Sequence, residues 1–212
     1  MFQEFRTAVR KTALGVVACS GLLILPNLAR ADDAADAKTF ISDVHRQVVE
    51  VFVRGDNSAS RRKIFANMVH DYLAVEALLP QVIGEYWSNA TNEERKNLSE
   101  AYKRYAANVY AEALDELFIK DFSITKVEAQ GAGRFKVMTK VDRTYSPVGK
   151  NFAWNVIEDS TGQFRIVDVA EGGFSLAAIE KKEWDAVLKA GGVRGMLDKL
   201  GARLMEARAT AN

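Results

Sequence analysis

The spacing of apolar residues changes once along the chain, and this change limits the fold more than any other feature. Before Asp121, apolar side chains recur every three or four residues, which is typical of amphipathic helices. After Asp121 they alternate with polar side chains, which is typical of half-buried strands. Helices followed by a run of strands indicate an α+β domain in which helices pack against an antiparallel sheet.

The helical part predicts four segments, over residues 40–52, 60–75, 80–87 and 91–118. Pro80 suits the first turn of the short third helix, where a missing amide hydrogen costs nothing. Thr91 and Glu94 form a capping box that predicts the start of the long fourth helix. Two further helices are expected after the strands, over residues 177–189 and 193–208, separated by Gly191 and Gly192.

Four strands are predicted between these helices, near residues 123–128, 135–141, 152–156 and 164–168. Turn residues join them at 131–133, 145–149 and 159–162. Connections this short join antiparallel neighbours in a meander. The expected fold is therefore α+β, with helices packed on a curved antiparallel meander sheet of about four strands. Such a sheet can curl around an apolar pocket.

The N-terminus predicts an export signal. Three basic residues precede an apolar run from Thr12 to Leu25, and Ala29 and Ala31 have the spacing that signal peptidase reads. The run of roughly 14 residues is shorter than the ~20 that a bilayer span needs. We therefore expect residues 1–31 to be a cleavable signal peptide, residues 32–212 to be a single domain, and the mature protein to reside in the periplasm.

Cys19 is the only cysteine in the sequence. It ends a loose lipoprotein box, so lipidation at Cys19 is an alternative to cleavage after Ala31. After cleavage no disulfide is possible, and the fold depends on its hydrophobic core, for which an apolar content of 48% is ample. The signal holds four basic residues and one acidic residue, which leaves 25 basic and 27 acidic residues and a net charge of −2. This balance disfavours a general nucleic-acid binder.

Residues that could carry chemistry are sparse. Neither His45 nor His70 belongs to a metal-binding spacing, and we interpret both as hydrogen-bonded histidines at or near the surface. No nucleophile elbow or phosphate loop occurs. Asp168 is an acidic residue on an apolar strand face, and a buried carboxylate that holds the following loop is favoured over a catalytic acid. Because no second polar group converges on it, the sequence predicts no enzyme, no metal site and no cofactor.

Two stretches resemble a known family. Residues 84–95 (GEYWSNATNEER), followed by Leu98 and Tyr102, resemble the G-x-x-W-x-x-A-T/S helix junction of MlaC-type proteins. Residues 168–176 (DVAEGGFSL) resemble the D-V-x-x-E-G-x-S-L segment that follows the last strand in that family. The resemblance extends from about Phe40 to Leu200, in consistent order. The family is also called the toluene-tolerance or ABC-transporter auxiliary family.

This resemblance implies a fold like that of nuclear transport factor 2, with acyl chains held in a deep pocket. It also implies a periplasmic shuttle that binds phospholipid and serves outer-membrane lipid asymmetry. The implied partners are an outer-membrane lipoprotein–porin complex and an inner-membrane ABC transporter with MCE domains. The bound lipid is then cargo and not a cofactor.

The sequence departs from the family pattern, and the function is open to more than one interpretation. Gly172 stands where the family often has Glu, and Phe164 stands where it usually has Trp. Residues 191–193 are similar to HpnM, the hopanoid-associated branch, so a hopanoid is an alternative cargo. The fold is also compatible with a small enzyme, and with an adaptor whose pocket is filled by its own side chains.

For the lipid pocket we expect apolar side chains of the strand face and of the long helix predicted to face it. These residues are Phe135, Val137, Phe152, Trp154, Ile166, Tyr105 and Val109. The alternative is that many of them pack against each other as ordinary core.

Overall fold

The computed structural model describes residues 31–54, 58–115, 119–144 and 146–210. The signal peptide and the lipoprotein box predicted above lie outside these ranges, except for Ala31. Among the described residues, none of the helices combines the length and the apolar character that a membrane span requires.

In the described part of the chain, five helices precede the strands and one follows them. The first five are α1 (Ala31–Arg54), α2 (Ser58–Tyr72), α3 (Val75–Ile83), α4 (Glu85–Asn89) and α5 (Asn92–Asp115). The strands are β1 (Ile119–Gly131), β2 (Arg134–Arg143), β3 (Ser146–Glu158), β4 (Phe164–Glu171) and β5 (Phe174–Ser175), and α6 (Leu176–Thr210) ends the described chain.

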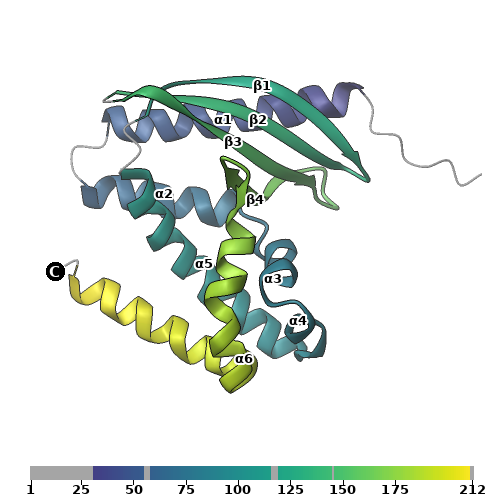
Figure 1. Cartoon of the computed structure of the whole chain (residues 1–212), viewed down its shortest axis with the longest axis vertical. Coiled ribbons are helices and arrows are strands. Elements are labelled where there is room, and N and C mark those ends of the chain that lie inside the picture. The colour runs from purple at the N-terminus through teal and green to yellow at the C-terminus, as the bar shows by residue number, and fades with distance from the viewer. Residues whose placement is uncertain (1–30, 55–57, 116–118, 145, 211–212) are drawn as a thin grey trace, which may run out of the picture.

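The strands form one antiparallel sheet in the order β1-β2-β3-β4-β5 (Figure 1). The predicted α+β fold with a meander sheet is confirmed, with the two-residue β5 as a fifth strand. The pairing register shifts between Ile124 and Lys126 and again between Asn155 and Val156. Such irregularities bend a strand and increase its twist, which gives this sheet its curvature.

Two hydrophobic cores lie on opposite sides of α2. The sheet core contains α1, Met68 of α2 and the apolar face of the sheet, including Phe135, Val137 and Val156. The helical core joins α2 through α6 and contains Leu98, Tyr102 and Trp184 among its buried residues. In Figure 1, α1 runs along the curved sheet, while α5 and α6 lie below it. The sheet core is the one that packs directly on the apolar face of the strands.

The predicted start of α5 is confirmed. The amide of Glu94 donates to Thr91 Oγ1 at 3.2 Å, and the amide of Thr91 donates to Glu94 Oε2 at 2.8 Å. These reciprocal bonds satisfy two amides that the first helical turn would leave unpaired.

The prediction for the segment before Pro80 was wrong. A helix was expected to continue to Val75, but α2 ends at Tyr72 and α3 begins at Val75, so Pro80 lies inside α3 and not in its first turn. The cause is tertiary: the amide of Ala74 donates to the carbonyl of Ile166 on β4 at 2.8 Å. This bond to the sheet replaces the bond that would have continued the helix.

The turn predicted over residues 145–149 is shorter than expected, because β3 already begins at Ser146. Gly149 therefore has a role within the strand. A Cβ at this position would lie 2.9 Å from the carbonyl oxygen of Val141, so only glycine permits this close approach to β2.

The predicted break before the last helical segment is confirmed. Gly192 has φ 59° and ψ −152° and interrupts α6 at a sharp kink. This backbone conformation is accessible to glycine and to essentially no other residue.

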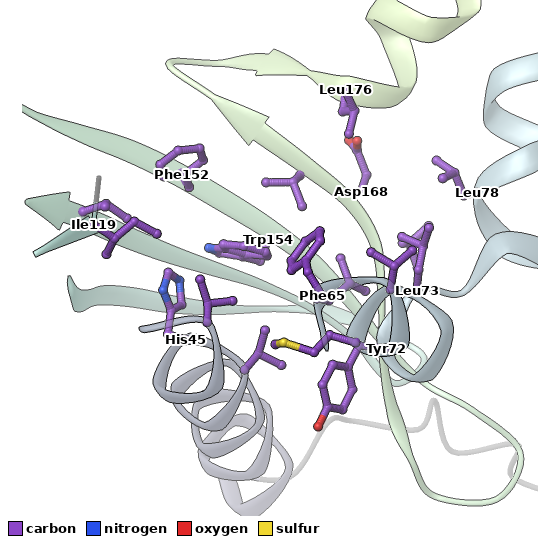
Figure 2. Close-up of a pocket in the computed structure, with 18 residues that line it drawn as sticks. His45, Phe65, Tyr72, Leu73, Leu78, Ile119, Phe152, Trp154, Asp168 and Leu176 are labelled. Carbon is purple, nitrogen blue, oxygen red and sulfur yellow. The ribbon is translucent and has the colours of Figure 1, made fainter. Parts of the chain in front are cut away.

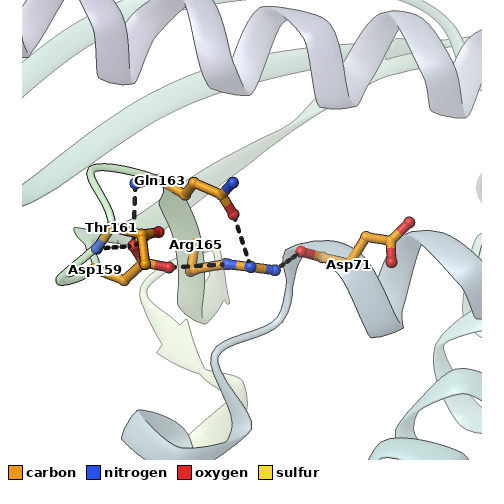
Figure 3. Close-up of polar contacts among 5 residues, drawn as sticks. All are labelled: Asp71, Asp159, Thr161, Gln163 and Arg165. Carbon is orange, nitrogen blue, oxygen red and sulfur yellow. Dashed lines mark hydrogen bonds and ion pairs between the residues drawn. The ribbon is translucent and has the colours of Figure 1, made fainter.

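Arg165 fastens β4 to the end of α2 (Figure 3). Its guanidinium donates to the backbone carbonyl of Asp71 and, at 2.9 Å, to Gln163 Oε1, and it lies 3.4 Å from Asp159 Oδ2. Hydrogen bonds from Thr161 and Gln163 lower the pKa of Asp159 to about 2. The turn predicted at 159–162 is thus confirmed, and it holds the arginine that fixes α2 beside the sheet.

Candidate functional site

A partly open, almost entirely apolar cavity of about 240 Å³ lies between the sheet, α1 and α2 (Figure 2). Phe65 of α2 lies next to Trp154 of β3, and Tyr72 of α2 and Phe152 of β3 also line the cavity. Further lining comes from Val44 and Val48 of α1, from Ile119 of β1, from Ile166 to Val169 of β4, and from Leu176 at the start of α6.

The cavity occupies one end of a sheet face whose other end is filled. Phe135 pairs with Val156, and both are about 1% exposed, so this end of the sheet is closed core. Further along the same face, Val137 pairs with Trp154, and Trp154 is only partly buried and lines the cavity. Directly paired residues of neighbouring strands share a face. The sheet therefore changes from packed core to cavity wall along β3.

Three of the seven predicted pocket residues, Phe152, Trp154 and Ile166, line the cavity. Phe135 and Val137 are buried in the sheet core next to it. That any of them contacts a lipid stays a prediction.

The other two predicted pocket residues, Tyr105 and Val109, lie elsewhere. Tyr105 packs in the helical core with its ring centroid 5.7 Å from that of Trp184, and Val109 is 38% exposed. The expectation that the long helix faces the strands is therefore corrected: α5 packs against α2 and α6, while α1 and α2 cover the sheet.

The sequence interpretation missed lining residues on α3, β1, β2, β4 and α6, and it missed all of those on α1 and α2. Val44 and Val48 lie within the predicted helix 40–52, and Phe65 and Tyr72 within the predicted helix 60–75, but none of them was predicted to line the pocket. An apolar stripe indicates that one side of a helix is buried, but it does not indicate which element packs against that side.

Asp168 borders the cavity as a structural residue. Its carboxylate accepts hydrogen bonds from Ser175 Oγ at 2.7 Å, from the amide of Ala177 at 3.0 Å and from Asn155 Nδ2 at 3.4 Å. The prediction that a buried Asp168 holds the following loop is confirmed. The side chain is 5% exposed, and it fixes Leu176 at the cavity.

Two further polar groups at the cavity wall are also paired. Trp154 Nε1 donates to Thr139 Oγ1 at 3.0 Å, which orients the indole. The hydroxyl of Tyr72 is within 2.8 Å of Gln47 Nε2.

His45 differs from these groups. It is 4% exposed, and its ring stacks on Phe122 with 3.9 Å between centroids and contacts Trp154 edge-on at 5.0 Å. Its Nε2 atom is buried and has no hydrogen-bond partner among the described residues. Burial lowers the pKa of His45 from 6.5 to about 4, so the ring is neutral at neutral pH.

The interpretation of both histidines as hydrogen-bonded surface residues was thus wrong for His45. The physical reason is its place on α1, four residues after Ile41 and three before Val48 on the stripe that faces the sheet. His70 is exposed, with Nδ1 3.2 Å from Asp71 Oδ1, as predicted for a surface histidine.

The arrangement is suited to holding apolar chains. Within the described ranges, no three His, Cys, Asp or Glu side chains lie close enough to hold a metal ion. The cavity is smaller than the roughly 300–1,000 Å³ of ordinary ligand sites. The cavity volume equals that of on the order of eight water molecules, and a methylene group is about as large as a water molecule. In this conformation the cavity therefore accepts part of one acyl chain.

Comparison with known proteins agrees with this geometry. One solved structure with the same fold is the phospholipid-binding protein from Ralstonia solanacearum in complex with a phospholipid. The match has a TM-score of 0.66 and 21% sequence identity, and it covers 84% of this chain and 99% of that chain. The family model described as MlaC protein matches residues 42–202, which is most of the chain. This chain therefore belongs to the MlaC family.

Proposed function

We propose that this protein is a periplasmic carrier that binds phospholipid by its acyl chains in the cavity between α1, α2 and the sheet. The observation that carries the proposal is the apolar cavity, which lies on the sheet of an MlaC-family chain. A phospholipid is bound to the Ralstonia protein, which has the same fold. Family membership supports the finer proposal, a shuttle between an outer-membrane lipoprotein complex and an inner-membrane transporter with MCE domains.

The energetics favour a carrier that exchanges its cargo readily. Burying one methylene group away from water contributes about 0.8 kcal/mol, so one long acyl chain gains on the order of 10 kcal/mol over water. A bilayer buries the same chain equally well. Transfer between membrane and carrier is therefore nearly balanced, and a partner at each membrane can determine its direction.

The test is native mass spectrometry of the protein purified from the periplasm of a Gram-negative host, together with identification of extracted lipids. We expect a mature chain that begins at Asp32 and carries phospholipid. A hopanoid in place of phospholipid would change the proposed cargo. A mature protein that repeatedly purifies without lipid after mild handling would contradict the carrier and favour the adaptor.

A matched pair of variants ties the cargo to the cavity. Val169→Trp places an indole beside Trp154 at the cavity wall, whereas Val148→Trp makes the same change at a site that is 70% exposed on β3. Val137 is unsuitable because it is completely buried, and a larger side chain there would overpack the core. We expect Val169→Trp to lose most of the bound lipid and Val148→Trp to retain it, with both circular dichroism spectra unchanged. Equal lipid content in the two variants would place the lipid elsewhere.

A further inference from the structure

Among the described side chains that line the cavity, that of His45 has a buried ring nitrogen without a hydrogen-bond partner. Three buried side-chain nitrogens of the described residues have no hydrogen-bond partner, and of the three residues only His45 lines the cavity. Trp154, Tyr72 and Asp168, the other polar side chains at the wall, have the partners given above. An unpaired buried nitrogen is unfavourable, and a ligand atom that pairs with it removes this penalty.

The imidazole of His45 is held in place on two sides. Phe122 of β1 lies parallel to it, with 11° between the ring planes. Trp154 of β3 meets it at 78°, and Figure 2 shows His45 and Trp154 at the cavity wall. Trp154 is itself fixed by its hydrogen bond to Thr139, which is 1% exposed. The ring therefore holds a defined position in the wall, as a binding residue requires.

The chemistry of the wall selects the kind of partner atom. None of the described residues that line the cavity is a lysine or an arginine, so a phosphate group would enter without a counter-charge. A neutral imidazole can donate one hydrogen bond from a ring nitrogen. In a diacyl lipid, the ester carbonyl is the polar group that lies between the headgroup and the apolar chain, and it is an acceptor only.

We propose that His45 donates a hydrogen bond to an ester carbonyl of the bound lipid, and so fixes the depth of the acyl chain and favours ester lipids over lipids without this carbonyl. The inference rests on the proposed function and adds a specificity-determining residue to it. The phosphate and the headgroup then stay at or outside the cavity mouth. The apolar side chains of α1 and α2 contact the chain below the ester.

The experiment compares two lipids that differ only at the proposed contact. Mixed vesicles contain equal amounts of dipalmitoyl phosphatidylglycerol, a diester, and dihexadecyl phosphatidylglycerol, its diether analogue. Lipid-free mature protein is loaded from these vesicles, and native mass spectrometry gives the ratio of ester to ether lipid bound. His45→Phe removes the donor and keeps an aromatic ring, while His70→Phe is the control at an exposed histidine.

One hydrogen bond predicts a roughly three- to tenfold higher ester-to-ether ratio for the wild type than for His45→Phe. His70→Phe should keep the wild-type ratio, and His45→Gln, which retains a donor, should recover part of it. Equal ratios in the wild type and a folded His45→Phe would overturn the inference, even if both bind lipid well. If His45→Phe does not fold, the other two proteins still test the inference. A wild-type ratio that is higher than that of the vesicles and only partly retained by His45→Gln supports it, and a wild-type ratio equal to that of the vesicles overturns it. A wild-type protein that takes up neither lipid would instead refute the proposed function.

Discussion

The buried imidazole of His45 should make the stability of the lipid-free protein depend on pH in a way that one substitution removes. Burial lowers the pKa of His45 from 6.5 to about 4. Between these values the unfolded chain binds a proton at His45 and the folded protein does not. The free energy of unfolding therefore falls as the pH decreases through this range. Above pH 6.5 the ring is neutral in both states, and His45 does not lower the stability through protonation.

The magnitude follows from the width of this range. Each pH unit between the two pKa values corresponds to about 1.4 kcal/mol, so the interval from 6.5 to about 4 corresponds to about 3 kcal/mol. This is a large share of the roughly 5–15 kcal/mol by which a domain is stable. Burial with an unpaired Nε2 and aromatic neighbours is the cause, since the charged ring would lose its hydration without gaining a partner.

His45→Phe keeps the ring stacked on Phe122 and removes both nitrogens. At pH 7 the change relieves an unpaired buried nitrogen, which should stabilise the lipid-free protein by about 1 kcal/mol and raise Tm by about 2–4 °C. Toward pH 4, the advantage of the variant over the wild type should grow by up to about 3 kcal/mol. Carboxylates titrate equally in both proteins, so the difference between the two isolates His45.

The assay is urea unfolding followed by tryptophan fluorescence and circular dichroism, at half-unit steps from pH 4 to pH 7. His70→Phe serves as the control, because it makes the same change at an exposed histidine. Parallel stability profiles for the wild type and His45→Phe would refute the reasoning. They would mean that His45 binds a proton as readily in the folded protein as in the unfolded chain.

Two further substitutions test the parts of the fold that fix the cavity and the last helix. Asp168→Ala leaves the amide of Ala177 without its acceptor and should cost about 2–3 kcal/mol of unfolding free energy, measured by urea unfolding. Asp168→Asn, which keeps an acceptor oxygen, should cost less. Gly192→Ala forces alanine into a positive-φ conformation and should cost about 1–3 kcal/mol, whereas Gly201→Ala in the same helix should stabilise by up to about 1 kcal/mol, because nothing lies within 4 Å of its added methyl group. Similar effects of the two glycine substitutions would contradict the account of the kink.

Much of the fold could be predicted because it depends on local patterns. The change of apolar spacing separates helices from strands, the capping box places the start of α5, and short turns make the sheet a meander. Asp168 could also be interpreted correctly, because an acidic residue on an apolar strand face must find donors nearby. Each of these features is decided by neighbours in sequence or by a general cost of burial.

The parts that could not be predicted depend on which surfaces meet. The stripes of α1, α2 and α5 are all compatible with packing on a sheet, and only the folded chain shows that α5 packs on helices. The end of α2 is set by a hydrogen bond to Ile166 in a strand that lies far away in sequence. The burial of His45 could not be predicted for the same reason. A polar residue on an apolar stripe is buried or exposed according to the width of the contact that covers the helix.

The division into two cores indicates where the protein can make room for a larger ligand. A cavity of about 240 Å³ is too small for a lipid with two long chains, so binding a whole lipid requires one wall to move. Residues of α2 belong to both cores, with Met68 in the sheet core and Val69 in the helical core, so a shift of α2 would disturb the packing of both. The buried apolar residues of α1, among them Ile41 and Val48, belong to the sheet core alone. A displacement of α1 would therefore enlarge the cavity while the helical core stays intact.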